Sequence, residues 1–127
     1  MAEEFEKFET FESSESSSDP DGDEATLRRL AAAGADMTRS TQFIHYLTFD
    51  EEDKMVSVAT ALKGTLGYDV QGYAPDESNE GWSLWVFIDR LPTSSEVQKM
   101  RKIMTVAADR FGGMYEGWEA EVRRSTE

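Results

Sequence analysis

The sequence contains no cysteine, one histidine and three prolines among its 127 residues. Without cysteine the chain forms no disulfide, no thiolate metal site and no cysteine nucleophile. The longest apolar run covers residues 84–88, far short of the roughly 20 apolar residues that cross a bilayer. The first residues, MAEEFEKF, are acidic where a signal peptide is basic. These absences predict a cytoplasmic protein with one folded domain and no cofactor.

Negative charge is abundant and unevenly distributed. Residues 1–24 hold ten of the 26 acidic side chains and one lysine, whereas residues 25–127 hold sixteen acidic and twelve basic side chains. This division predicts an acidic Phe/Ser-rich disordered tail, 1–24, and a single domain, 25–127. In the tail, Phe5, Phe8 and Phe11 recur every three residues, so a helix would place them roughly on one face. Two interpretations stay open: a solvated tail that aids solubility, or an acidic-aromatic segment that folds on a basic partner.

The periodicity of apolar residues after the tail predicts an α+β fold. Thr93 and Glu96 form a capping box ahead of a helix, and Gly34 closes an earlier one. The elements expected are a helix over 25–34, strands within 38–49, 67–75, 82–91 and 114–122, and helices over about 50–64 and 93–111. With right-handed crossovers, the order β-α-β-β-α-β gives a ferredoxin-like sandwich, a four-stranded antiparallel sheet with two helices on one face. The helix over 25–34 lies outside this unit.

The first and third strands of this unit are apolar on both faces. Two helices cover only one face, and Ile44, Tyr46, Trp85 and Phe87 point to the other. Soluble monomers usually avoid an exposed apolar patch of that size. We therefore expect a cover, which is the N-terminal helix, a second copy of the chain or a different partner.

The residue types that carry catalysis are sparse. His45 is the only histidine and has no orienting acid near it in the sequence, which favours a hydrogen-bonded structural role. The acids of Asp50-Glu51-Glu52-Asp53-Lys54 are typical of caps and first-turn residues, and their spacing lacks the central glycine of a calcium loop. No GxSxG, P-loop or dinucleotide-binding pattern appears. The sequence predicts that this protein is not an enzyme and binds no metal.

Aromatic residues on central strands raise the possibility of nucleic-acid binding. Tyr46, Trp85 and Phe87 would form a stacking platform of the kind that binds single-stranded RNA. Backbone affinity also needs lysines and arginines around the platform, and these two strands supply only Arg39 and Arg90 at their ends. The other basic residues cluster on the second helix: Lys99, Arg101, Lys102 and Arg110. We therefore expect no direct contact with nucleic acid.

Four segments resemble a known family in their order and spacing. They are STQFIHYLTF, LGYDV, the helix that ends in MTVAADRFGG, and YEGWEAEV. Over about residues 38–122 the chain resembles the regulator of ribonuclease E activity, B type. The most specific piece is Tyr115-Glu116-Gly117-Trp118, which is similar to the family's Tyr-Asp-Gly-Trp. The Gly67-Tyr68 pair before the second strand also matches.

The resemblance implies a ferredoxin-like fold and no catalytic activity. It also implies a cytoplasmic protein that binds a ribonuclease E-type endoribonuclease away from its active site and inhibits or modulates its RNA processing. The target in that family is an arginine-rich scaffold, which an acidic regulator complements electrostatically. The best-known members carry their acidic run after the last strand, whereas here it precedes the domain.

Five aromatic residues are the candidates for partner binding: Tyr46, Trp85, Phe87, Tyr115 and Trp118. Trp118 is the large apolar residue on its face of the last strand, which favours a place in the core over an exposed anchor. Gly117 beside it predicts a bulge or a close approach of two backbones. A monomer or a homodimer is compatible with these features. An alternative function from a different class is a homodimeric module that holds a ligand or a subunit on its sheet, with no link to RNA metabolism.

Overall fold

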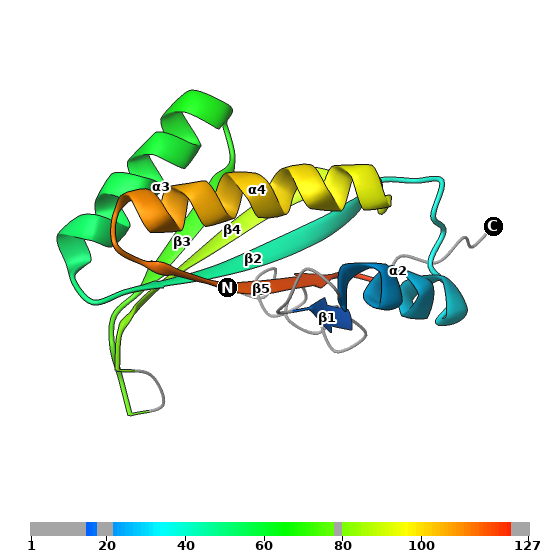
Figure 1. The fold of residues 1–127 in the computed structure, drawn as a ribbon, viewed down its shortest axis with the longest axis horizontal. Helices are drawn as coiled ribbons and strands as arrows, with labels where there is room; N and C mark the ends of the chain where they lie inside the picture. Colours follow the sequence, from blue (N-terminus) through cyan, green and yellow to red (C-terminus); the bar gives the residue numbers. More distant parts are fainter. Residues whose placement is uncertain (1–14, 18–21, 78–79, 123–127) are drawn as a thin grey trace, which may run out of the picture.

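A computed structural model describes residues 15–17, 22–77 and 80–122 (Figure 1). Five strands form one antiparallel sheet in the order β1-β5-β2-β4-β3. The elements in chain order are β1 (Glu15–Ser17), α2 (Gly22–Ala32), β2 (Thr41–Phe49), α3 (Glu52–Leu66), β3 (Asp69–Tyr73), β4 (Trp82–Arg90), α4 (Ser94–Arg110) and β5 (Met114–Ala120).

The unit from β2 to β5 confirms the predicted ferredoxin-like α+β fold. Its strands lie in the order β5-β2-β4-β3, so the first and third strands of the unit are central. Strand β1 adds a fifth strand beyond this unit, at the free edge of β5. The sequence did not predict β1, and it placed the start of the N-terminal helix at residue 25 rather than at Gly22. Residues 1–14 and 18–21 of the expected disordered tail lie outside the described residues.

Local signals place most of the element ends. The Thr93 side chain accepts a hydrogen bond from the Glu96 backbone N–H at 3.3 Å, as the capping pattern predicts. Helix α3 continues past the expected end at Gly64 because Gly67 is the residue that adopts the left-handed conformation, with φ of 73°. The register between β5 and β2 shifts between Tyr46 and Leu47. Gly117, opposite Tyr46, has φ of 121°, so the predicted bulge is confirmed.

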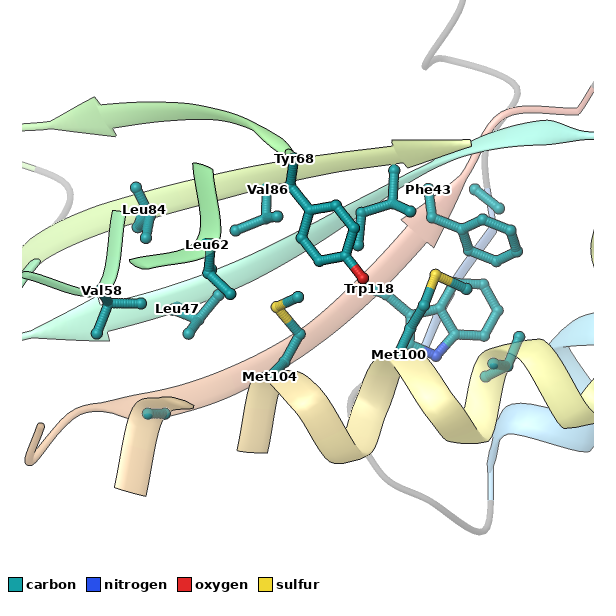
Figure 2. Packing of buried hydrophobic residues seen from close by; sticks show 14 of the residues in the cluster. Phe43, Leu47, Val58, Leu62, Tyr68, Leu84, Val86, Met100, Met104 and Trp118 are labelled. Carbon is teal, nitrogen blue, oxygen red and sulfur yellow. The ribbon is translucent and has the colours of Figure 1, made fainter. Parts of the chain in front are cut away.

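Helices α3 and α4 lie on the same face of the sheet and bury the main core against it (Figure 1). Figure 2 shows Met100 and Met104 of α4 pointing toward the sheet, which contributes Phe43, Leu47 and Trp118 to the same layer. The alternation of side chains along β2 and β4 supplies the sheet side of this core, because every second side chain of these strands points toward the helices. The sheet face away from α3 and α4 is the face that the sequence analysis predicts to be covered by neither of these helices.

Helix α2 packs on the helix side of the sheet, beside α4. Leu27 and Leu30 are buried in the same core cluster as Phe43 and Trp118, whereas Ile44, on the other face, is not part of that cluster. The N-terminal helix is therefore not the cover of the second face, which removes one of the three alternatives. Within the described residues, no helix is long and apolar enough to cross a bilayer.

Candidate partner-binding surface

The sheet surface opposite α3 and α4, which we call the open face, is aromatic at its centre. The register places Tyr46 of β2 directly beside Trp85 of β4, and Ile44 beside Phe87. Tyr73, at the end of β3, points to the same face because it lies two residues beyond Gln71, the partner of Trp85. Period-two alternation alone thus brings four aromatic side chains from three strands onto one surface.

Three of the four rings pack around the fourth, the Trp85 indole. Ring centroids lie 5.2 Å apart for Tyr46 and Trp85, 4.8 Å for Tyr73 and Trp85, and 6.5 Å for Trp85 and Phe87. Tyr46, Trp85 and Phe87 are half-buried and Tyr73 is exposed, while Ile44 is completely buried. The apolar patch is therefore smaller than the sequence predicts, but aromatic surface remains accessible at its centre.

Carboxylates flank this aromatic centre at the end where Phe87 lies. Asp69 and Glu119 lie in the same row across the sheet as Phe87 and Ile44, and Asp89 lies one row further along. The Tyr46 hydroxyl donates a hydrogen bond of 2.9 Å to Glu119 Oε1. Burial, and then this hydrogen bond to an anion, raise the pKa of Tyr46 above its usual range, so its hydroxyl stays protonated.

The open face has no positive charge of its own on the strands β2 to β5. Arg90 is the single basic residue of these four strands, and by alternation it faces the helix side, with its guanidinium 5.9 Å from the Tyr68 ring centroid. The described part of this surface therefore offers aromatic rings and carboxylates together. That combination favours cations, arginine above all, because guanidinium stacks on aromatic rings and pairs with carboxylates.

The remaining two predicted partner-binding residues lie on the other side of the sheet. Trp118 is 1% exposed and tilts against Phe43 in the core, with ring centroids 5.3 Å apart, which confirms its expected place there. Tyr115 is half-buried beneath α4, and its hydroxyl lies 2.8 Å from His45 Nδ1. The structure thus separates the five residues into a surface group and a core group. We therefore leave Tyr115 and Trp118 out of the candidate surface.

A buried polar network joins that core group to α2 and α4. Asp23 of α2 accepts two hydrogen bonds from the Arg101 guanidinium, both of 2.9 Å, and a third of 2.9 Å from Trp118 Nε1. The Arg101 guanidinium also lies over the Tyr115 ring, 5.2 Å from its centroid. Among the described residues, every buried side-chain nitrogen and oxygen has a hydrogen-bond partner, which is the condition under which a buried ion pair is tolerated. The network anchors α2 to the domain.

His45 belongs to the same layer and is structural. It is completely buried, and its Nε2 lies 3.4 Å from Met100 Sδ. Burial first, and then the Arg101 charge, lower the pKa of His45 to about 3, with the Asp23 carboxylate acting in the opposite direction. Burial raises the pKa of Tyr115, so its hydroxyl stays protonated and shares a hydrogen bond with His45 Nδ1, whose direction is set by the tautomer of the ring. A neutral, enclosed imidazole of this kind has no access to a substrate proton.

The acidic segment at the start of α3 also has a structural role. Asp50 pairs with Lys54 at 3.0 Å on the exposed surface, and Glu51 occupies the cap position without a side-chain hydrogen bond. Glu52 and Asp53 fill the first turn, where the helix dipole favours negative charge. Among the described residues, no group of three histidine or acidic side chains is arranged to hold a metal ion.

Sequence reasoning missed several residues of these two sites. Tyr73 and Glu119 were detectable, because simple alternation along β3 and β5 points both toward the open face. Asp23 falls within the stretch that the sequence assigns to the tail, and no sequence pattern links it to Arg101, which lies 78 residues away. Arg101 itself was counted with the basic residues of α4, although it turns inward.

Comparison with protein-family models finds one match over the unit that the geometry defines. The model described as regulator of ribonuclease activity B matches residues 21–120, which include α2 and every strand from β2 to β5. A search of curated proteins finds no match. The match covers most of the chain and agrees with the order of the elements, so the protein belongs to the family of regulator of ribonuclease activity B.

Proposed function

We propose that this protein regulates a ribonuclease E-type endoribonuclease by binding to it through the open face of its sheet, without catalysing a reaction. Membership of a family described as a regulator of ribonuclease activity supports the biological role. The observation that carries the binding mode is the aromatic centre around Trp85, edged by the carboxylates of Asp69, Asp89 and Glu119. A basic, arginine-containing segment of the nuclease is the partner that suits this surface.

The proposed mechanism divides association from dissociation. The net charge of −13 attracts a basic partner over long distances, so charge sets the rate of association. Half-buried aromatic residues at the centre of an interface dominate the energy of the bound state, so they set the rate of dissociation. The protein would bind the scaffold of the nuclease, outside the catalytic centre. It would alter the processing of RNA by changing which other molecules that scaffold binds. The absence of cysteine and the enclosure of His45 support a role without chemistry.

Binding kinetics with a purified endoribonuclease of this type test the proposal. Replacing Trp85 by Ala is expected to weaken binding by about 2 kcal/mol, roughly 30-fold, almost entirely through faster dissociation. Val56→Ala serves as the control, because Val56 is an exposed apolar residue of α3, on the opposite side of the sheet. Equal affinities for the two variants and the wild type would remove the open face from the interface.

A charge-matched comparison tests the electrostatic part separately. Asp69→Asn with Asp89→Asn neutralises two carboxylates beside the aromatic centre, and Glu52→Gln with Asp53→Asn neutralises two exposed ones at the start of α3. Both double variants change the net charge equally, so both slow long-range association similarly. Only the Asp69/Asp89 variant is expected to speed dissociation as well. Identical dissociation rates would show that these carboxylates act at a distance and not in the interface.

A further inference from the structure

The sheet ends in β3 on the side away from β1 (Figure 1). Strand β3 pairs with β4 on one side, and among the described residues no strand pairs with it on the other. Gly72 in this strand is exposed, and because glycine has no side chain, the exposed part is backbone. A strand edge of this kind presents N–H and C=O groups with which another chain can pair.

Strand β3 lacks the features that usually protect such an edge. Its sequence, DVQGY, contains no lysine and no proline, and its register with β4 runs from Asp69 to Tyr73 without a bulge. Strand β1, at the opposite edge of the sheet, is only three residues long. The edge of β3 is therefore the longer of the two and the better suited to the addition of a strand.

One hydrogen bond shows which way the backbone groups of the neighbouring strands point. The Glu121 N–H donates to the Gln42 carbonyl oxygen at 3.0 Å, so Gln42, in β2, turns its backbone groups toward β5. Successive residues of a strand turn these groups to alternate sides, so His45 turns its N–H and C=O toward β4. His45 lies opposite Val86, whose backbone groups therefore point back toward β2.

The same alternation along β4 and β3 identifies the groups at the free edge. Trp85, next to Val86, points its backbone groups toward β3, where its partner is Gln71. Gln71 therefore bonds to β4, while Val70 and Gly72 on either side of it point their N–H and C=O groups toward the free edge. Among the described residues, these outward groups have no hydrogen-bond partner. The edge thus offers donors and acceptors to an added strand.

The side chains of β3 extend the open face to this edge. Asp69, Gln71 and Tyr73 point to that face, and the Tyr73 ring centroid lies 4.8 Å from that of Trp85. The Asp69 side chain is exposed and forms no ion pair with the described residues. Residues opposite each other on paired strands share a face, so every second side chain of an added strand would lie beside this row. An arginine there could pair with the carboxylate or stack on the tyrosine ring.

Charge indicates which kind of strand suits this edge. A second copy of the chain would bring the same net charge of −13, whereas a basic extended segment is attracted. We propose that the partner nuclease adds such a segment to β3 as a further strand, bonded to the outward groups of Val70 and Gly72. Arginines at every second position of the segment then lie beside Asp69 and Tyr73 on the open face. This inference rests on the proposed function and adds to it the way in which the partner binds.

Amide hydrogen exchange of the full chain tests the pairing directly. In the free protein, Val70 and Gly72 should exchange quickly, while Gln71 and Tyr73, which bond to β4, should exchange more slowly. Saturation with a purified ribonuclease E-type endoribonuclease should slow exchange at Val70 and Gly72 by at least about 10-fold, because their N–H groups acquire acceptors. The exchange is stopped by acid and read by NMR after the nuclease is removed.

Gly72→Pro and Gly72→Ala form a matched pair of variants. Both add a Cβ that meets the flexible end of the Met55 side chain, 2.8 Å from its Cε, but only proline lacks the N–H. An edge strand tolerates proline where the N–H points to solvent, so both variants should fold. Gly72→Pro should weaken binding of the nuclease by about 10-fold or more relative to Gly72→Ala.

Several results would overturn the proposal. If the nuclease binds through Trp85 and exchange at Val70 and Gly72 does not change, the open face is the interface and the edge of β3 is not. Equal affinities of Gly72→Pro and Gly72→Ala would likewise exclude backbone pairing at this position. Slow exchange at both amides in the free protein would show that the edge is already occupied, by a second copy if dilution removes the protection and by the chain itself if it does not. A nuclease that fails to bind would remove the proposed function and this inference together.

Discussion

Asp23→Ala is expected to destabilise the domain strongly, because this carboxylate is the centre of the buried polar network. Its oxygens accept three hydrogen bonds, two from Arg101 and one from Trp118 Nε1, each of 2.9 Å. The Asp23 and Arg101 side chains are 7% and 13% exposed, so water has little access to either. Alanine at position 23 leaves the guanidinium charge and the indole N–H enclosed without their acceptor.

The size of the effect follows from that enclosure. Removing one partner of a buried ion pair costs about 3–5 kcal/mol, because the other charge is left uncompensated. A domain of this size is typically stable by about 5–15 kcal/mol, so the loss is a large part of the total. Replacing both partners with apolar residues is much less harmful, since no charge then stays buried. The double variant Asp23→Leu with Arg101→Met is therefore expected to be more stable than Asp23→Ala, although Trp118 Nε1 still lacks its acceptor.

Urea unfolding followed by tryptophan fluorescence measures these free energies. Asp50→Ala is the control, because it removes one partner of the exposed Asp50–Lys54 pair and changes the net charge by the same amount. We expect little change in the control and a clear shift of the midpoint for Asp23→Ala. If the two single variants unfolded at the same urea concentration, the network would not anchor α2. A double variant less stable than Asp23→Ala would contradict the role assigned to the unpaired charge.

Two further predictions concern His45 and the glycines of α3. Because His45 is the only histidine, its ring signals in NMR are unambiguous, and they should not titrate between pH 8 and 5; a midpoint near 6.5 would contradict its enclosure. Its folded pKa of about 3 lies below the unfolded value of 6.5, so the unfolded chain binds more protons between these values. The stability advantage of the wild type over His45→Gln should then shrink as pH falls below 6.5, by at most about 1.4 kcal/mol per unit. Gly64→Ala, in the helix interior with open space around the added Cβ, should stabilise the domain by about 0.5–1 kcal/mol. Gly67→Ala should destabilise it by about 1 kcal/mol, because Gly67 has a φ of 73°. Thermal unfolding that ranks the two variants in the reverse order would refute this reasoning.

The sequence predicted the ferredoxin-like unit because each of its elements follows a local rule. Phe43, His45 and Leu47 alternate along β2, and Thr93 with Glu96 begins α4, so both elements can be identified without knowledge of their neighbours. Crossover handedness then leaves few arrangements of such a series. Gly117 was identified, for the same local reason, as the site of a bulge or a close approach of two backbones, and the structure has the bulge. The end of α3 was placed at Gly64 because two nearby glycines carry the same signal, and only the backbone conformation shows that Gly67 is the cap.

The candidate surface was predicted in part. Alternation placed Tyr46, Trp85 and Phe87 on the sheet face away from the helices, and the register confirms that they share it. Tyr115 lies just before the bulge, where a one-residue shift in register reverses the face to which a side chain points. The position of Tyr115 beneath α4 could therefore be determined only from the pairing of β5 with β2.

The sequence by itself determined the family, the order of the elements and the aromatic character of the sheet, since all three depend on spacing along the chain. Only the tertiary structure decided the position of α2 and the roles of Asp23 and Arg101. These residues lie 78 positions apart, and their pairing depends on the packing of α2 against α4 at the edge of β5. Such a contact leaves no periodic trace in the sequence, because a carboxylate in the first turn of a helix looks the same whether it faces water or a buried guanidinium.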